Sequence, residues 1–99
     1  MMEFSVKILD NQQNHMLNIC DIDLLGKKIT EDHLNMNISK SYYGEKIVEH
    51  KEAQSLLKNA KIINMVGKDT ISLSLELGVG SENGIKTIGG VPFLIVYQM

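Results

Sequence analysis

Apolar and polar residues alternate strictly at the start of the chain. Phe4, Val6 and Ile8 alternate with polar neighbours, so one face of a strand is apolar and the other is polar. A polar run at 11–14 then supplies turn chemistry before a second strand-like run at 16–20. The pattern therefore predicts an N-terminal β-hairpin.

One turn of helix is predicted directly after the hairpin. Asp21 is placed to cap this turn, Asp23 suits its positively charged end, and Gly26 can close it. Further along, the range 34–38 alternates as a half-exposed strand does. The range 39–48 indicates a loop followed by a brief strand.

A helix is predicted from about residue 51, because the apolar residues there are spaced i, i+3, i+4 and i+7. These residues are Ala53, Leu56, Leu57 and Ala60. The short apolar run 62–66 follows, and its period does not distinguish strand from helix. Local spacing leaves 71–77 open as well: its perfect alternation favours a strand, whereas Asp69 can cap a helix and Gly78 can end one.

The last two apolar runs, 85–88 and 91–97, lie on either side of Gly89 and Gly90. They are rich in β-branched and aromatic residues, which indicates two strands or one bent strand with a glycine break. We interpret the break as a β-bulge. The alternative is a loop where the main chain is approached closely by a ligand or an RNA backbone, because glycine has no side chain to obstruct it.

These patterns predict one small α+β domain over residues 1–99, with a mixed or antiparallel sheet, an N-terminal hairpin and two main helices. A chain of 99 residues is long enough for one hydrophobic core and too short for two.

The net charge and the cysteine content limit which ligands and which cellular compartment we expect for the protein. The net charge is −2, so no overall positive field draws the chain to DNA, RNA or an anionic membrane, and any RNA contact must be local. Cys20 is the single cysteine and cannot form an internal disulfide, which favours the reducing cytoplasm. The N-terminus lacks the pattern of a secretory signal, and the run 91–97 is far shorter than the roughly 20 residues of a membrane span.

Four short blocks carry a resemblance to a known family. They are Cys20-Asp21 with Leu24 to Lys27, Tyr43-Gly44 with Ile47-Val48, Ala60 with Asn64 and Val66-Gly67, and Ile88 to Pro92. In this order and spacing they resemble the archaeal family called domain of unknown function 424, over nearly the whole chain. The resemblance implies an archaeal cytoplasmic protein and a helix at 71–77. Such proteins are sometimes described as predicted RNA-binding proteins, which implies a role near translation.

The chain departs from the family pattern in two places. Phe93 to Tyr97 is apolar on both strand faces, so the second face needs a cover, either the helix at 71–77 or another protomer. His50 stands where family members carry an acidic residue before the helix, which puts the capping of that helix in question.

Several residues are candidates for contact with RNA or another ligand. Lys27, Lys40 and Lys46 would contact phosphates, and Tyr43, next to Tyr42, would stack on a base. A solvated loop face is the alternative for this group. Asn64 lies inside an apolar run and needs hydrogen-bond partners, so we interpret it as a tie to a loop or a helix cap, with ligand contact as the alternative.

The sequence contains no pattern typical of a catalytic, metal or cofactor site. His15, His33 and His50 lack metal-ligand spacing, so neither a metal nor a cofactor is predicted. Cys20 is interpreted as a small buried hydrophobe, although a helix N-terminus could activate it as a nucleophile.

We therefore predict a noncatalytic accessory protein of translation or ribosome maturation that contacts RNA, a ribosomal protein or both. Two alternatives stay open. One is a homodimeric protein-interaction module that pairs through Phe93 to Tyr97, and the other is a small enzyme using Cys20.

Overall fold

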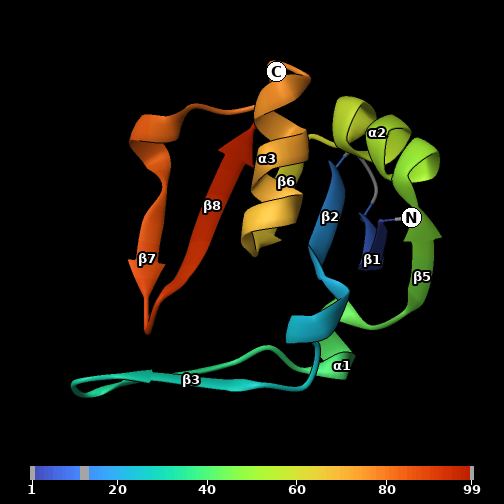
Figure 1. Cartoon of the computed structure of the whole chain (residues 1–99). Helices are drawn as coiled ribbons and strands as arrows, with labels where there is room; N and C mark the ends of the chain where they lie inside the picture. The colour runs from blue at the N-terminus through green and yellow to red at the C-terminus, as the bar shows by residue number, and fades with distance from the viewer. Residues whose placement is uncertain (1, 12–13, 99) are drawn as a thin grey trace.

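The computed structural model describes residues 2–11 and 14–98, which form a six-stranded mixed sheet and a two-stranded ribbon (Figure 1). The strand order in the sheet is β5-β1-β2-β6-β8-β7, where β2 and β6 run parallel and the other neighbouring pairs run antiparallel. In chain order these strands are β1 (Glu3–Asn11), β2 (Asn14–Asp21), β5 (Lys46–Glu49), β6 (Ile62–Val66), β7 (Lys86–Ile88) and β8 (Val91–Tyr97).

The other elements lie on or beside this sheet. They are the ribbon strands β3 (Lys28–Glu31) and β4 (Leu34–Asn37), the helices α1 (Lys40–Tyr43), α2 (His50–Asn59) and α3 (Lys68–Glu76), and the 3₁₀ turns η1 (Ile22–Leu24) and η2 (Glu82–Gly84). The predicted α+β class, mixed sheet, N-terminal hairpin and two main helices are confirmed. Gln12 and Gln13 of the predicted hairpin turn lie outside the described residues.

The helices α2 and α3 cover one face of the sheet, where the main core forms (Figure 1). Every second residue of the central strands points to this face, because side chains alternate along a strand. The buried strand residues in this core are Phe4, Val6, Leu17, Ile19, Val48, Ile63, Met65 and Leu94. Their packing against Leu57 of α2 and Leu73 of α3 contributes about 1.5–3 kcal/mol for each large side chain removed from water.

We call the opposite side of the sheet the open face. A second, smaller core covers its end nearest the ribbon, where Ile29, Ile38 and Tyr43 pack with Cys20 and Val66. The other end of the open face is exposed: Ile95 and Tyr97 of β8 have 57% and 73% of their surface in solvent. The prediction that β8 is apolar on both faces thus corresponds to one face packed against the main core and one left partly exposed.

The segment 71–77 is helical, as the family resemblance implied. Thr70, Leu73 and Ser74 of α3 are buried at helical spacing, and the Ser74 hydroxyl donates a hydrogen bond to the Val79 carbonyl at 2.6 Å. Because Thr70 and Ser74 take two of the buried positions of α3, its buried stripe is not wholly apolar. The apolar residues of 71–77 alone therefore show an alternating pattern and no helical period. Among the described residues, no helix is long and apolar enough to cross a membrane.

Two local predictions, the β-bulge and the loop at the start of 39–48, are wrong, and one strand was not predicted. The glycine break is a two-residue hairpin turn between β7 and β8, because Ile88 pairs with Val91 in regular register and leaves no extra residue for a β-bulge. Gly89 and Gly90 have φ of +57° and +80°, as such a turn requires. The strand β3 was missed because only Ile29 of its residues is buried. The single turn α1 was missed because its one buried residue gives no period.

Candidate functional site

A polar row crosses the open face at the level where the second core ends. The strand register places Lys7 opposite Asn18, Asn18 opposite Asn64, and Asn64 opposite Ile95. All four side chains therefore lie on the open face, since directly paired residues share a face. Polar residues in the middle of a sheet need partners, and α1 provides them.

The helix α1 is fixed to this row through its carbonyl groups. Lys7 Nζ donates to Ser41 O at 2.7 Å, Asn18 Nδ2 donates to Tyr42 O at 3.0 Å, and Ser5 Oγ donates to Tyr43 O at 2.7 Å. The last carbonyls of a helix have no partner inside the helix, so these three donors complete it. At the other end, Ser39 Oγ accepts from the Tyr42 amide at 3.2 Å. One turn of helix is thereby held rigidly over the sheet.

A groove of about 500 Å³ opens beside α1 on the open face. Tyr42 stands on one wall with 60% of its surface exposed. Asn64 lies in the floor, Lys86 of β7 lies on another wall, and Phe93 and Ile95 of β8 supply apolar surface. Lys86 is the one charged side chain among the described residues that line the groove. The groove therefore combines an exposed aromatic ring, a carboxamide and a single cation.

The sequence favours Asn64 as a direct tie to a loop backbone, but in the structure Asn64 bonds to the side chain of Asn18 instead. Its Nδ2 donates to Asn18 Oδ1 at 2.8 Å, and Asn18 in turn holds the Tyr42 carbonyl. The other expected role, capping the helix near Asp69, belongs to Asp21. Asn64 remains partly exposed and lines the groove, so its side chain is accessible to a ligand there.

The four residues predicted for RNA contact do not form one surface. Tyr43 is only 8% exposed, so its ring packs inside the second core and cannot stack on a base in this conformation. Burial, then the neighbouring Cys20 and Tyr42, raise the pKa of Tyr43 to about 12. The adjacent Tyr42, whose ring meets Tyr43 edge to face at 5.9 Å, is the exposed aromatic.

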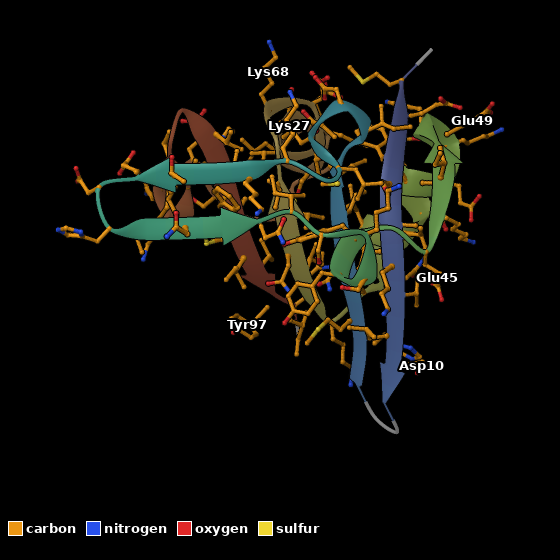
Figure 2. All side chains as sticks on the ribbon, turned by 90° about the horizontal axis from the view of Figure 1, so that it is seen from below. Asp10, Lys27, Glu45, Glu49, Lys68 and Tyr97 are labelled. Carbon is orange, nitrogen blue, oxygen red and sulfur yellow. The ribbon has the colours of Figure 1, made fainter. Side chains whose placement is uncertain are left out.

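The predicted lysines are separated as well. Lys27 lies near the root of the ribbon in Figure 2, where its carbonyl accepts from the Ile38 amide at 2.9 Å. Lys40 is exposed at the start of α1. Lys46 lies on β5, the strand at the far edge, and pairs with Glu52 at 2.9 Å. Only Lys40 of the three thus lies on α1.

Gly89 is approached closely by another part of the same chain, and not by the ligand or RNA backbone of the alternative interpretation. A Cβ on Gly89 would lie 2.5 Å from the Ile29 side chain and 3.0 Å from the Thr30 carbonyl. The Gly89 amide also donates to Glu31 Oε1 at 2.9 Å. The turn is thus occupied by the ribbon, whereas Gly90 faces open space.

Cys20 is poorly suited to act as a nucleophile. It is fully buried in the second core. Burial, followed by the charges of Asp21 and Asp23, raises the pKa of its thiol to about 12. Since the thiolate is the reactive form, the fraction of reactive sulfur at neutral pH is negligible.

The histidines give no metal site among the described residues, where no cluster of three potential ligands occurs. His15 pairs with Asp10 at 3.0 Å, and both are largely exposed. A smaller pocket of about 240 Å³ near His15 lies between the N-terminal hairpin and α2, and its lining is mostly apolar.

Sequence reasoning missed Asn18, which holds α1, and Lys86, which lines the groove, and it assigned the stacking ring to Tyr43 instead of its neighbour Tyr42. Asn18 carried the same signal as Asn64, a carboxamide inside an apolar strand run. Pairing the two would have required the parallel register of β2 with β6, which sequence spacing does not reveal. Lys86 gave no local signal, because it reaches the groove only through the register with Phe93.

Comparison with known proteins gives two matches. Residues 9–99 match the family model described as "Protein of unknown function (DUF424)". The crystal structure of an uncharacterized conserved protein from Methanopyrus kandleri matches with a TM-score of 0.77 and 23% sequence identity, covering 98% of this chain and 94% of that chain. At that identity the likeness extends to the fold alone. No curated protein matches the chain.

Proposed function

The chain belongs to the archaeal DUF424 family of proteins of unknown function, and from this premise we propose that it is a noncatalytic accessory factor that binds single-stranded RNA on its open face. In its broader form, the proposal assigns the protein to translation or ribosome maturation, where it would contact RNA, a ribosomal protein or both. The observation that carries it is the exposed ring of Tyr42 beside a groove lined by Lys86.

Stacking on Tyr42 would supply most of the affinity. Single-stranded nucleic acids bind without sequence preference through aromatic rings, because every base offers a flat π face. The backbone of Tyr42 is already held in place by the hydrogen bonds that fix α1, so binding would order few new backbone groups. This rigidity supports a binding role more than a flexible surface tyrosine would.

Local charge supports an anionic ligand despite the net charge of −2. Lys86 lies inside the groove without an acidic neighbour among the described lining residues. Lys40 at the start of α1 and Lys27 at the ribbon root are both exposed and would extend the phosphate path. Lys46 is left out of this path because Glu52 offsets its charge.

The test is RNA binding by variants of Tyr42. Fluorescence anisotropy with a labelled eight-nucleotide RNA at low salt should show that Tyr42→Ala weakens binding roughly tenfold, as expected for loss of one stacked base. Tyr42→Phe keeps the ring and should bind within about twofold of the unchanged protein. Circular dichroism of both variants checks that the fold is kept.

Two results would overturn the proposal. If Tyr42→Ala binds RNA as strongly as the unchanged protein, RNA does not bind at the open face through Tyr42. Absence of RNA binding at low salt, together with affinity capture from native lysate that recovers no ribosomal component, would remove the proposed function in both forms.

A second candidate function is a homodimeric interaction module through Phe93 to Tyr97. Strand β7 pairs with β8 only as far as Phe93, so the edge of Ile95 and Tyr97 on that side has no strand neighbour in the described sheet. Their exposed apolar side chains add contact area. Light scattering at high protein concentration separates the two functions, since a strictly monomeric particle excludes the dimer.

A further inference from the structure

The direction of the hydrogen-bond chain under α1 is fixed at one end. A backbone carbonyl only accepts, so Asn18 must present its Nδ2 to Tyr42 O and its Oδ1 to Asn64. Asn64 in turn must present its Nδ2 to Asn18. Its own Oδ1 is left without a donor among the described residues, and Asn64 is part of the groove floor.

Tyr42, Asn64 and Lys86 border the same groove and offer three different kinds of contact. Tyr42 offers a flat ring, the Asn64 carboxamide offers hydrogen bonds to a planar edge, and the Lys86 ammonium offers a positive charge. Phe93 and Ile95 give the apolar surface between them. A volume of about 500 Å³ is in the range of sites for one small molecule.

We propose that the groove is a subsite for one nucleoside monophosphate unit, with the base stacked on Tyr42, its edge on Asn64 and its phosphate on Lys86. The inference rests on the proposed RNA-binding function and deepens it by naming the ligand unit and a phosphate-contacting residue. The shared chemistry is the same whether the unit is a free nucleotide or part of an RNA chain. The polar chain thus has two uses: it fixes α1, and it aims a carboxamide oxygen at the base.

Lys86 is placed to contact a phosphate rather than to support the fold. It is exposed, and its position opposite Phe93 in the β7–β8 register puts its side chain on the open face. No ion pair joins it to an acidic residue among the described side chains. Its ammonium group is therefore available to a phosphate that enters the groove.

The experiment compares cytidine 5′-monophosphate with cytidine by NMR titration of the labelled protein. The nucleotide should bind about threefold more tightly than the nucleoside, as expected for one exposed charge pair. Both should shift the signals of Tyr42, Ile95 and the Asn64 side-chain amide. In Lys86→Gln the ratio of the two affinities should fall to about one, because the phosphate then meets no charge.

The matched control is Lys58→Gln. Lys58 is also an exposed lysine, but it lies on α2, which covers the opposite face of the sheet. Its replacement should leave the threefold preference for the phosphate unchanged. An eight-nucleotide RNA should displace cytidine 5′-monophosphate from the unchanged protein if both occupy the groove, which distinguishes a unit of RNA from a site for free nucleotides alone.

The outcomes separate this inference from the proposed function. If RNA binds in a Tyr42-dependent way but the phosphate preference survives in Lys86→Gln, or the shifts map elsewhere, the subsite is wrong and the RNA-binding function stands. If the free nucleotide binds as described and RNA neither binds nor displaces it, the subsite serves free nucleotides and the RNA function is wrong. If neither ligand binds, both proposals are wrong.

Discussion

Asp21 joins the end of one central strand to the start of the helix that follows the next strand. Its carboxylate accepts from the Thr70 amide at 2.8 Å, the Thr70 hydroxyl at 2.7 Å and the Asp69 amide at 3.1 Å. The helix α3 has no cap from its own preceding residue, which is Gly67. Asp21 therefore replaces a local cap with one from a distant part of the chain, and Gly67 has no side chain to block it.

Removal of the Asp21 carboxylate should destabilise the protein. Asp21→Ala should lower the free energy of unfolding by about 2 kcal/mol, because it takes away a helix cap and leaves buried donors unpaired. Urea denaturation measures the change. Asp23→Ala is the matched control, an exposed carboxylate two residues away, and should change stability by no more than about 0.5 kcal/mol. Equal losses in the two variants would contradict the long-range cap.

The buried thiol of Cys20 makes stability depend on pH in alkaline solution. Its pKa is raised from 9.0 to about 12, so between these values the folded protein keeps a proton that the unfolded chain releases. The stabilisation is complete below pH 9 and is lost as the pH rises, at up to about 1.4 kcal/mol per pH unit. Tyr43 acts in the same direction from about pH 10.

Urea denaturation between pH 8 and pH 10 tests this dependence. The free energy of unfolding should fall as the pH rises, and Cys20→Ala should flatten the curve over this range, because the titrating thiol is gone. An unchanged slope in Cys20→Ala would show that other groups cause the alkaline loss of stability.

At the scale of elements, the ribbon of β3 and β4 is attached to the sheet through the β7–β8 turn. Gly89→Ala should destabilise the protein more than Gly90→Ala. Both positions have positive φ, so both variants are strained by about 1 kcal/mol, but only Gly89 is crowded by Ile29 and Thr30. Thermal unfolding gives the stability difference, and limited proteolysis shows whether the ribbon detaches. Equal melting temperatures of the two variants would mean that the ribbon moves away from Gly89 without a loss of stability, and would contradict this prediction.

Elements with a strong period could be predicted from the sequence, and those defined by tertiary contact could not. The hairpin of β1 and β2 and the helix α2 follow directly from apolar spacing. The helix α3 needed the family resemblance, because buried Thr70 and Ser74 replace apolar residues in its inner stripe. The residues of the groove could be predicted only in part. Asn64 was singled out, but sequence spacing does not tell which of Tyr42 and Tyr43 packs into the core.

At the scale of the whole molecule, two faces of one sheet have different roles. The face under α2 and α3 holds the main core, and the open face holds a smaller core and the groove (Figure 1). The ribbon extends past the sheet in Figure 2, while Tyr97 lies away from it at the exposed end of the open face. Ligand binding in the groove would therefore take place on the side of the sheet opposite α2 and α3.

The parallel pairing of β2 with β6 has a consequence for how the chain folds. Asn18 and Asn64 are neighbours across this pair but 46 positions apart in sequence, so a long loop must close before the centre of the sheet can form. Before β6 is available, β1 and β2 can pair only with each other and with β5, which forms one end of the six-stranded sheet. Contacts of such high sequence separation slow folding. During synthesis, the centre of the sheet therefore forms only after β6 has left the ribosome.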